Sequence, residues 1–176
     1  VDGYLDLVCR QILPAMANEP IECRFVDVFI EQGYFQVEHA ERLWQVARGL
    51  GFELKAHVDE FADIGAVPWA VGAGATSVEH LLATDDGAIA RLAASETVAV
   101  CLPLTSLFLR EPYAPMRKLT DAGALVAVAT DCNPGTSPLM SILLTMNMSC
   151  TLFRLTPEEA LVGATAHAAR ALGLSD

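Results

Sequence analysis

Five short apolar runs, rich in β-branched residues, alternate with segments of helical periodicity along most of this sequence. Each run stays apolar at consecutive positions for much of its length, which is typical of a strand covered on both faces. Strands of this kind, when helices separate them, form a parallel sheet. The sequence therefore predicts an α/β protein with strands at about residues 25–31, 53–59, 76–82, 97–103 and 125–131.

The segments between these runs carry helix signals. Apolar residues recur at helical spacing in residues 37–51, 85–95 and 114–124. The last helix is the best marked, because Thr156, Pro157 and Glu159 form a capping-box start and Gly173 closes the helix. No linker or low-complexity tract interrupts the chain, so we expect residues 1–176 to form one domain.

Two features favour a (β/α)8 barrel over an open doubly wound sheet. No strand is followed by the GxGxxG turn that binds dinucleotides. Polar residues instead gather at the carboxyl ends of several strands, which is the edge where barrels build active sites. A whole barrel takes roughly 250 residues, so we expect a partial TIM-type barrel of about strands 4 to 8, with the earlier strands lying before Val1.

Charge and cysteine content narrow the class of partner. The formal net charge is −11 and the 11 Lys and Arg residues are dispersed, whereas nucleic-acid binding needs clustered basic residues. No run reaches the roughly 18 apolar residues of a membrane span. The five cysteines form no CxxC pair, which indicates reduced thiols in the cytoplasm. We expect a small-molecule substrate, no nucleic acid and no membrane.

Histidine and acidic side chains stand at the predicted strand ends. They are Glu31, His57 with Asp59 and Glu60, Glu79 with His80, and Asp131. Imidazole nitrogens and carboxylate oxygens suit zinc, iron and related ions. Two histidines and an aspartate at three strand ends of one sheet therefore indicate a metal site, and Glu31 is a further candidate to face the pocket.

Strand parity constrains which acid after His57 reaches this site. In a regular strand, His57 and Asp59 share one face and Glu60 lies on the other. Glu60 can join the site only if the strand ends near Asp59 and the chain turns. A strand that runs straight through Phe61 favours Asp59 instead, and the sequence leaves both alternatives open.

Four motifs carry a resemblance to a known family. They are KAHVDEF at 55–61, SVEHL at 77–81, TDCNPG at 130–135, and LTPEEAL at 155–161 with the following GAT and AARALGL. In order and spacing they resemble imidazolonepropionases, a family of the amidohydrolase superfamily, from about Val26 to Leu174. The resemblance implies metal-dependent hydrolysis of the cyclic amide 4-imidazolone-5-propionate to N-formimidoyl-L-glutamate in histidine degradation.

The resemblance also implies a role for each matched position. His57 and Asp131 match ligands of one divalent metal ion, zinc or iron, and Asp131 also handles the proton of the attacking water. His80 matches the histidine that assists the attack. Glu60 matches the carboxylate that contacts the substrate ring and helps with proton transfer. The remaining substrate-lining positions are Asn133, Gly135 and Thr136. For a full-length member of the family we expect a homodimer.

The sequence departs from the family in one respect. Superfamily members carry an HxH pair at the end of the first strand, and these 176 residues contain none. The Arg and Tyr that typically clamp the substrate's propionate lie in the upstream half, so this stretch lacks them too. We therefore assign the activity to a parent protein and expect the chain by itself to bind metal weakly.

Two other interpretations stay open. The first is a sibling amidohydrolase, such as a purine or pyrimidine aminohydrolase, although the NPG that follows Asp131 and Cys132 disfavours it. The second is a non-catalytic half barrel that serves as a binding or assembly module.

Overall fold

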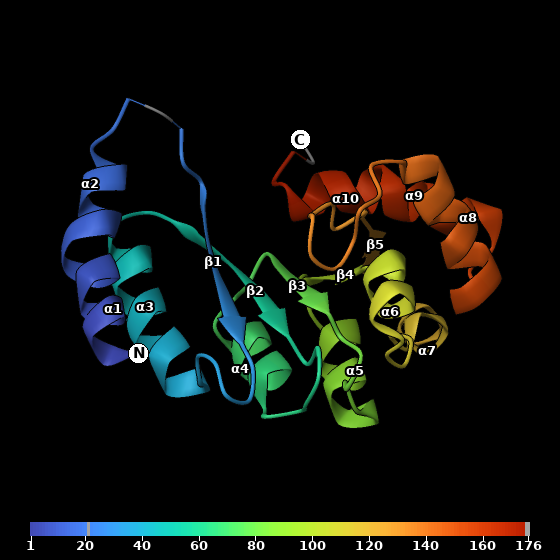
Figure 1. Ribbon diagram of the computed structural model, residues 1–176, viewed down its shortest axis with the longest axis horizontal. Helices are drawn as coiled ribbons and strands as arrows, with labels where there is room; N and C mark the ends of the chain where they lie inside the picture. Colours follow the sequence, from blue (N-terminus) through green and yellow to red (C-terminus); the bar gives the residue numbers. More distant parts are fainter. Residues whose placement is uncertain (21, 175–176) are drawn as a thin grey trace.

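The computed structural model describes residues 1–20 and 22–174 (Figure 1). In this part of the chain, five parallel strands form one sheet in the order β1-β2-β3-β4-β5. Their bounds are β1 Phe25–Ile30, β2 Glu53–Val58, β3 Ser77–His80, β4 Val98–Cys101 and β5 Val126–Val128. A doubly wound sheet reverses its strand order at a switch point, whereas here spatial order equals chain order. The expected partial barrel is confirmed.

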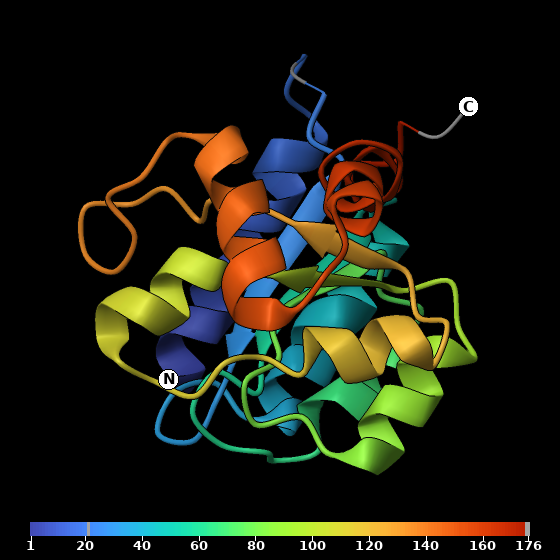
Figure 2. The ribbon, with the colours of Figure 1, turned by 90° about the vertical axis from the view of Figure 1, so that its right-hand side faces the viewer.

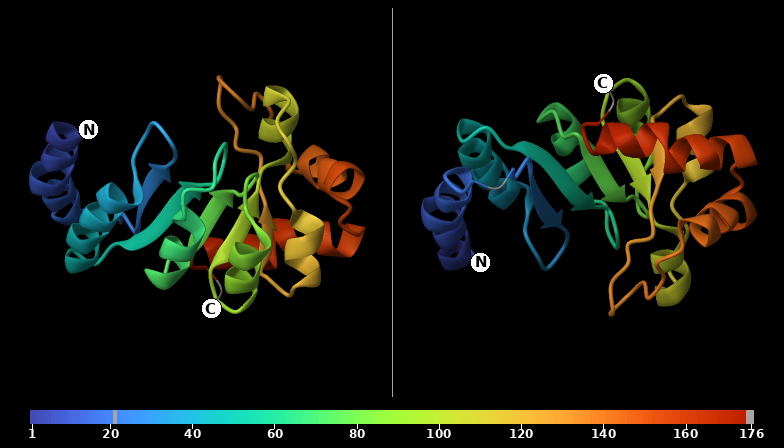
Figure 3. Two further views of the ribbon diagram at one scale, coloured as in Figure 1. Left: turned by 90° about the horizontal axis from the view of Figure 1, so that it is seen from below. Right: turned by 90° about the horizontal axis from the view of Figure 1, so that it is seen from above.

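Helices fill every connection between the strands. Between the strands they are α3 Val37–Gly49, α4 Ala66–Gly72, α5 Asp86–Ala93, α6 Pro103–Leu109 and α7 Met116–Asp121. After β5 follow α8 Ile142–Phe153, α9 Pro157–Ala164 and α10 Ala166–Ala171. Before β1 lie α1 Asp2–Leu7, the π-helical η1 Val8–Ile12 and α2 Leu13–Ala17. Figure 3 shows α1 to α3 at one end of the row of strands and α8 and α9 at the other. Among the described residues, no helix combines the length and hydrophobicity needed to cross a bilayer.

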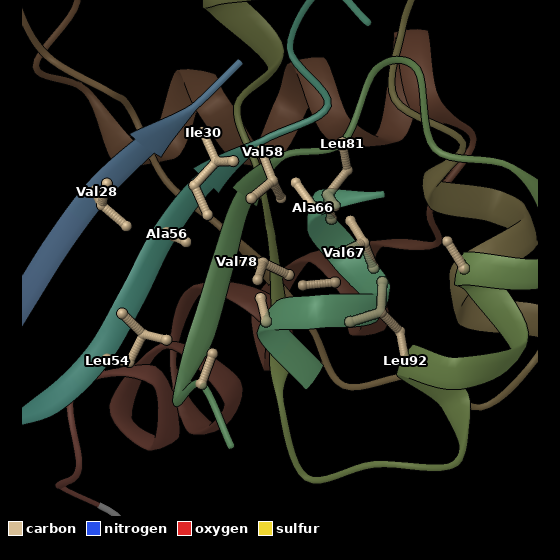
Figure 4. Packing of buried hydrophobic residues seen from close by; sticks show 14 of the residues in the cluster. Val28, Ile30, Leu54, Ala56, Val58, Ala66, Val67, Val78, Leu81 and Leu92 are labelled. Atoms are coloured by element: carbon tan, nitrogen blue, oxygen red, sulfur yellow. The ribbon is translucent and has the colours of Figure 1, made fainter. Parts of the chain in front are cut away.

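One face of the sheet is the hydrophobic core. Leu54, Ala56 and Val58 of β2 are fully buried, as are Ile30 and Val78 on the neighbouring strands. Figure 4 shows these side chains packed between the sheet and the residues of α4 and α5. Each large aliphatic side chain removed from water in this way contributes about 1.5–3 kcal/mol. The core thus stabilises the sheet on this face, and the charged side chains lie on the other face.

The opposite face, which would line the inside of a barrel, is divided in two. On β1 to β3 it carries charged side chains, since the parallel register sets Asp27 beside Lys55 and His57 beside Glu79, and two phenylalanines of β1, Phe25 and Phe29, lie among them. On β4 and β5 it is apolar, and Val98, Val100 and Ala127 pack there with Ala168 and Ala171 of α10.

The predicted final helix is wrong in one detail, because the structure breaks it into α9 and α10. The capping box is confirmed, with the Thr156 hydroxyl accepting from the Glu159 N–H at 3.2 Å. Thr165 leaves the helical region (φ −125°, ψ −88°), so α9 packs on the core side of β5 while α10 reaches the inner face. A Cβ on Gly163 would lie 3.1 Å from the Val126 carbonyl oxygen, so glycine permits the close approach of α9.

Candidate functional site

The strands end earlier than the sequence predicted, and four residues at or after the ends of β2, β3 and β5 adopt left-handed backbone. The φ angles are 51° at Asp59, 79° at His80, 66° at Leu81 and 51° at Asp131. Residues other than glycine in this region cost about 1–3 kcal/mol and persist where the surrounding structure imposes them, often at functional sites. Three strand ends carry this strain, and they are the ends at which the sequence placed the site.

The backbone at Asp59 decides which acid reaches the site. β2 ends at Val58, and the chain turns at Asp59. Oε1 of Glu60 then lies 3.7 Å from Nδ1 of His80. Asp59 is fully buried, and its Oδ2 instead accepts a hydrogen bond from the Thr84 hydroxyl at 2.9 Å. The condition that parity set for Glu60 is therefore met, and Asp59 ties β2 to the loop after β3.

A left-handed backbone conformation also brings His80 to the site. Its β3 neighbour Glu79 pairs with His57 on the inner face, so regular parity would direct His80 towards the core. With φ of 79°, the His80 ring instead lies 5.2 Å from the His57 ring, centroid to centroid. Its Nδ1 is buried and has no hydrogen-bond partner among the described residues. Burial, and then the positive charge of His57, lower the pKa of His80 to about 4, so the ring is neutral at pH 7.

His57 is held by a carboxylate that the sequence analysis did not single out. Its Nδ1 lies 3.0 Å from Oδ1 of Asp27 on β1. Asp27 comes two residues before Phe29, which is the residue that pairs with His57 in the sheet. Burial opposes the charged ring, but the hydrogen bond and the charge of Asp27, together with Glu79, outweigh it and raise the pKa of His57. A carboxylate on one ring nitrogen fixes the orientation of a metal-binding histidine and leaves the other nitrogen free.

Glu60 titrates near neutral pH. Burial, followed by the negative charge of Asp131, raises its pKa to about 7. A group with a pKa close to the working pH is effective in proton transfer, because both of its forms are populated.

Glu31 has a different role from the pocket-facing one considered above. It is 1% exposed, and its carboxylate accepts from the backbone N–H groups of Phe61 at 2.9 Å and Ala62 at 3.4 Å. A third bond comes from the N–H of Gln32 at 2.7 Å. Glu31 thus anchors the segment that follows Glu60. Its position at the end of a strand was the sequence feature that made it a candidate.

The loop of residues 130–138 is built on Asp131 and Asn133. The Asn133 amide donates to the Asp131 carbonyl oxygen at 2.8 Å, and its Oδ1 accepts from the N–H groups of Gly135 at 2.9 Å and Thr136 at 2.7 Å. The Asn133 side chain is therefore engaged within the loop, and its contact with substrate stays a prediction, as do those of Gly135 and Thr136. Figure 2 shows this loop projecting from the body of the molecule beside α6.

The Asp131 carboxylate has a partner from α6. The hydroxyl of Thr105 donates to Oδ2 of Asp131 at 2.6 Å, and Thr105 itself is 1% exposed. The sequence carried no signal for Thr105, because the bond joins helix α6 to the loop after β5, which only the fold brings together.

The polar inner face and Asp131 border one hollow of about 290 Å³. Lys55, His57, Glu79 and Asp131 supply its charged lining, and Val100, Leu102 and Ala127 are among its apolar walls. Asp27, His57 and Glu79 each present one ligand atom within 4.8 Å of the others. The hollow is just smaller than the usual small-molecule site, whose volume is about 300–1,000 Å³.

Known proteins resemble this chain in sequence and in fold. The imidazolonepropionase of Rhizorhabdus wittichii is 47% identical over 98% of this chain and 43% of that protein. That of Symbiobacterium thermophilum is 44% identical over 98% of this chain and 41% of that protein. An adenosine deaminase from Xanthomonas campestris with bound zinc superposes with a TM-score of 0.72 at 18% identity, over 96% of this chain and 43% of that one. The chain thus spans less than half the length of the curated relatives.

A family model gives the same result. Residues 31–176 match the model described as the Amidohydrolase family. The match covers the strand ends that bear His57, Glu60, His80 and Asp131. The chain therefore belongs to the amidohydrolase family.

Proposed function

We propose that the protein carrying this chain is a metal-dependent hydrolase that converts 4-imidazolone-5-propionate to N-formimidoyl-L-glutamate in histidine degradation. The observation that carries the proposal is the meeting of Glu60 and His80, 3.7 Å apart, beside the His57 ring. The identities of 44% and 47% to curated imidazolonepropionases support the choice of substrate.

The donor set fits one divalent metal ion, zinc or iron. His57 would offer the ring nitrogen that Asp27 does not bind, and Asp131 would offer a carboxylate oxygen. Imidazole and carboxylate are common ligands of both metals. When bound, such an ion lowers the pKa of water to about 7 and so supplies a nucleophile at neutral pH.

Side chains of this chain carry out the proton transfers of the proposed reaction. Asp131 takes the proton of the attacking water, whose oxygen adds to the ring carbonyl carbon. Neutral His80 stabilises the negative charge that develops on the carbonyl oxygen. Glu60, populated in both forms at pH 7, delivers a proton to the ring nitrogen as the C–N bond breaks. Gly135 and Thr136 lie on the loop that would border the substrate.

The location and assembly of the whole protein are part of the same proposal. All five cysteines are unpaired, which supports a reducing, cytoplasmic location. We expect a homodimer for the full-length protein, which light scattering after gel filtration measures directly.

The test uses the protein at its full encoded length. Purified protein is loaded with zinc or iron and given imidazolonepropionate, and formation of N-formimidoyl-L-glutamate is followed together with bound metal. Adenosine and guanine are the comparison substrates. Turnover of imidazolonepropionate is the expected result. Turnover of a nucleobase or nucleoside alone would favour an aminohydrolase, and metal-loaded protein without any turnover would favour a non-catalytic module.

A further inference from the structure

We infer that Thr105 is a positioning residue for Asp131. Its hydroxyl donates a hydrogen bond to Oδ2 of the carboxylate and so leaves Oδ1 free to face the hollow where metal and water would bind. The inference rests on the proposed function in one respect, namely that Asp131 serves as a metal ligand.

The hydrogen bond itself has the features of a strong, directed interaction. An ionised carboxylate only accepts, so the Thr105 hydroxyl is the donor. The distance of 2.6 Å falls in the range of about 2.5–2.7 Å for a hydroxyl bound to a charged oxygen, and such bonds are roughly twice as strong as neutral ones. Thr105 is 1% exposed, which protects the bond from competing water.

Threonines in the other helices of this chain use their hydroxyls differently. Each of the following donates to the carbonyl four residues earlier, at 2.8–3.1 Å: Thr120, Thr145 and Thr151. This back-bonding is the usual local solution for a helical threonine. Thr105 lies in the first turn of α6, and its hydroxyl instead crosses 26 positions of sequence to Asp131.

The surroundings of Asp131 give its two carboxylate oxygens different environments. Oδ2 faces the buried Thr105, whereas the residue as a whole is partly exposed and borders the 290 Å³ hollow. The backbone is held as well, since the Asp131 carbonyl oxygen accepts from the Asn133 amide at 2.8 Å. With the backbone and one oxygen fixed, the carboxylate cannot rotate freely, and Oδ1 is the oxygen left for a ligand.

The test compares Thr105→Val, which keeps the shape and removes the hydroxyl, with Thr105→Ser, which keeps the hydroxyl. Both are made in the protein at its full encoded length. Zinc affinity is measured by competition with a chromophoric chelator, the visible spectrum is recorded with cobalt in place of zinc, and kcat and KM are determined. Thr120→Val is the matched control, because it removes a hydroxyl that bonds only within its own helix.

We expect Thr105→Val to lower metal affinity about 10- to 100-fold, to change the cobalt spectrum and to lower kcat more than it raises KM. Thr105→Ser should restore metal affinity to within a few-fold of wild type, and Thr120→Val should leave it unchanged. Thermal unfolding of the metal-free variants separates these effects from a loss of fold.

Wild-type metal affinity and cobalt spectrum in a folded Thr105→Val would overturn the inference. So would a Thr105→Ser variant as impaired as Thr105→Val, since side-chain shape would then be responsible. A Thr105→Val that does not fold leaves the decision to Thr105→Ser, whose wild-type spectrum supports the inference and whose altered one refutes it. Metal affinity does not depend on substrate, so failure to hydrolyse imidazolonepropionate would sink the proposed function alone, whereas a wild type that binds no metal would sink both.

Discussion

The two halves of the inner sheet face differ in chemistry although they share one backbone architecture. On β1 to β3 the side chains form a charged network, in which Lys55 donates to Ser77 at 2.6 Å and lies 3.6 Å from Glu79. On β4 and β5 the same face is apolar and α10 covers it. The comparison shows that charged side chains gather on one half of the face, whereas Asp131 follows β5 at the end of the apolar half.

The largest expected difference between the halves concerns catalysis. Glu60→Gln in the full-length protein should lower kcat about 10²- to 10⁴-fold, because it removes the group that transfers protons next to His80. Glu158→Gln, an exposed acid on α9, is the matched control and should leave kcat unchanged. An unchanged kcat in Glu60→Gln would remove Glu60 from the mechanism.

The polar half should also make stability depend on pH. The pKa of Glu60 is about 7 in the folded state and near 4.5 when the chain unfolds. Between these values the folded state binds more protons, so this group makes the free energy of unfolding fall as pH rises, by up to about 3 kcal/mol in total. Urea unfolding of the metal-free protein at pH 5 and pH 8 should show that Glu60→Gln gains stability over wild type at the higher pH. An equal difference at both values would mean that the pKa of Glu60 is not raised.

The contact between Asp27 on β1 and His57 on β2 should raise the affinity for metal. Asp27→Ala leaves the His57 ring without its carboxylate partner, and we expect a loss of about 10- to 100-fold in zinc affinity. Asp27→Asn should fall between wild type and Asp27→Ala, because it keeps an oxygen acceptor and loses the charge. Asp121→Asn on the surface of α7 serves as the control. A zinc affinity equal to wild type in Asp27→Ala would show that Asp27 does not support metal binding by His57.

The apolar half should respond through stability alone. Val98 is fully buried, and Val98→Ala should lower the free energy of unfolding by about 1.5 kcal/mol at every pH between 5 and 8, without changing zinc affinity. Urea titration and chelator competition measure the two quantities. A pH-dependent loss, or a change in zinc affinity, would show that the halves are coupled.

Much of the fold could be predicted because its signals are local. Apolar runs separated by helical periodicity located all five strands, and the capping box of Thr156 and Glu159 located the start of α9. The strand ends were placed too late. The left-handed Asp59 stops β2 directly after Val58, and β5 ends at Val128 although the sequence still looks extended to Asp131. Helices α4, α6 and α8 carried no such local signal, because each is largely apolar and has no charged residue to mark a solvent-facing side.

By itself, the sequence determined the parallel architecture and the placement of His57, His80 and Asp131 at one edge, since residue type and strand position are local properties. The tertiary structure decided which groups touch. The φ angle at Asp59 directs Glu60 rather than Asp59 to His80. The sheet register brings Asp27 to His57, and the packing of α6 brings Thr105 to Asp131. These contacts join residues up to 30 positions apart, and no spacing within one strand or helix encodes them.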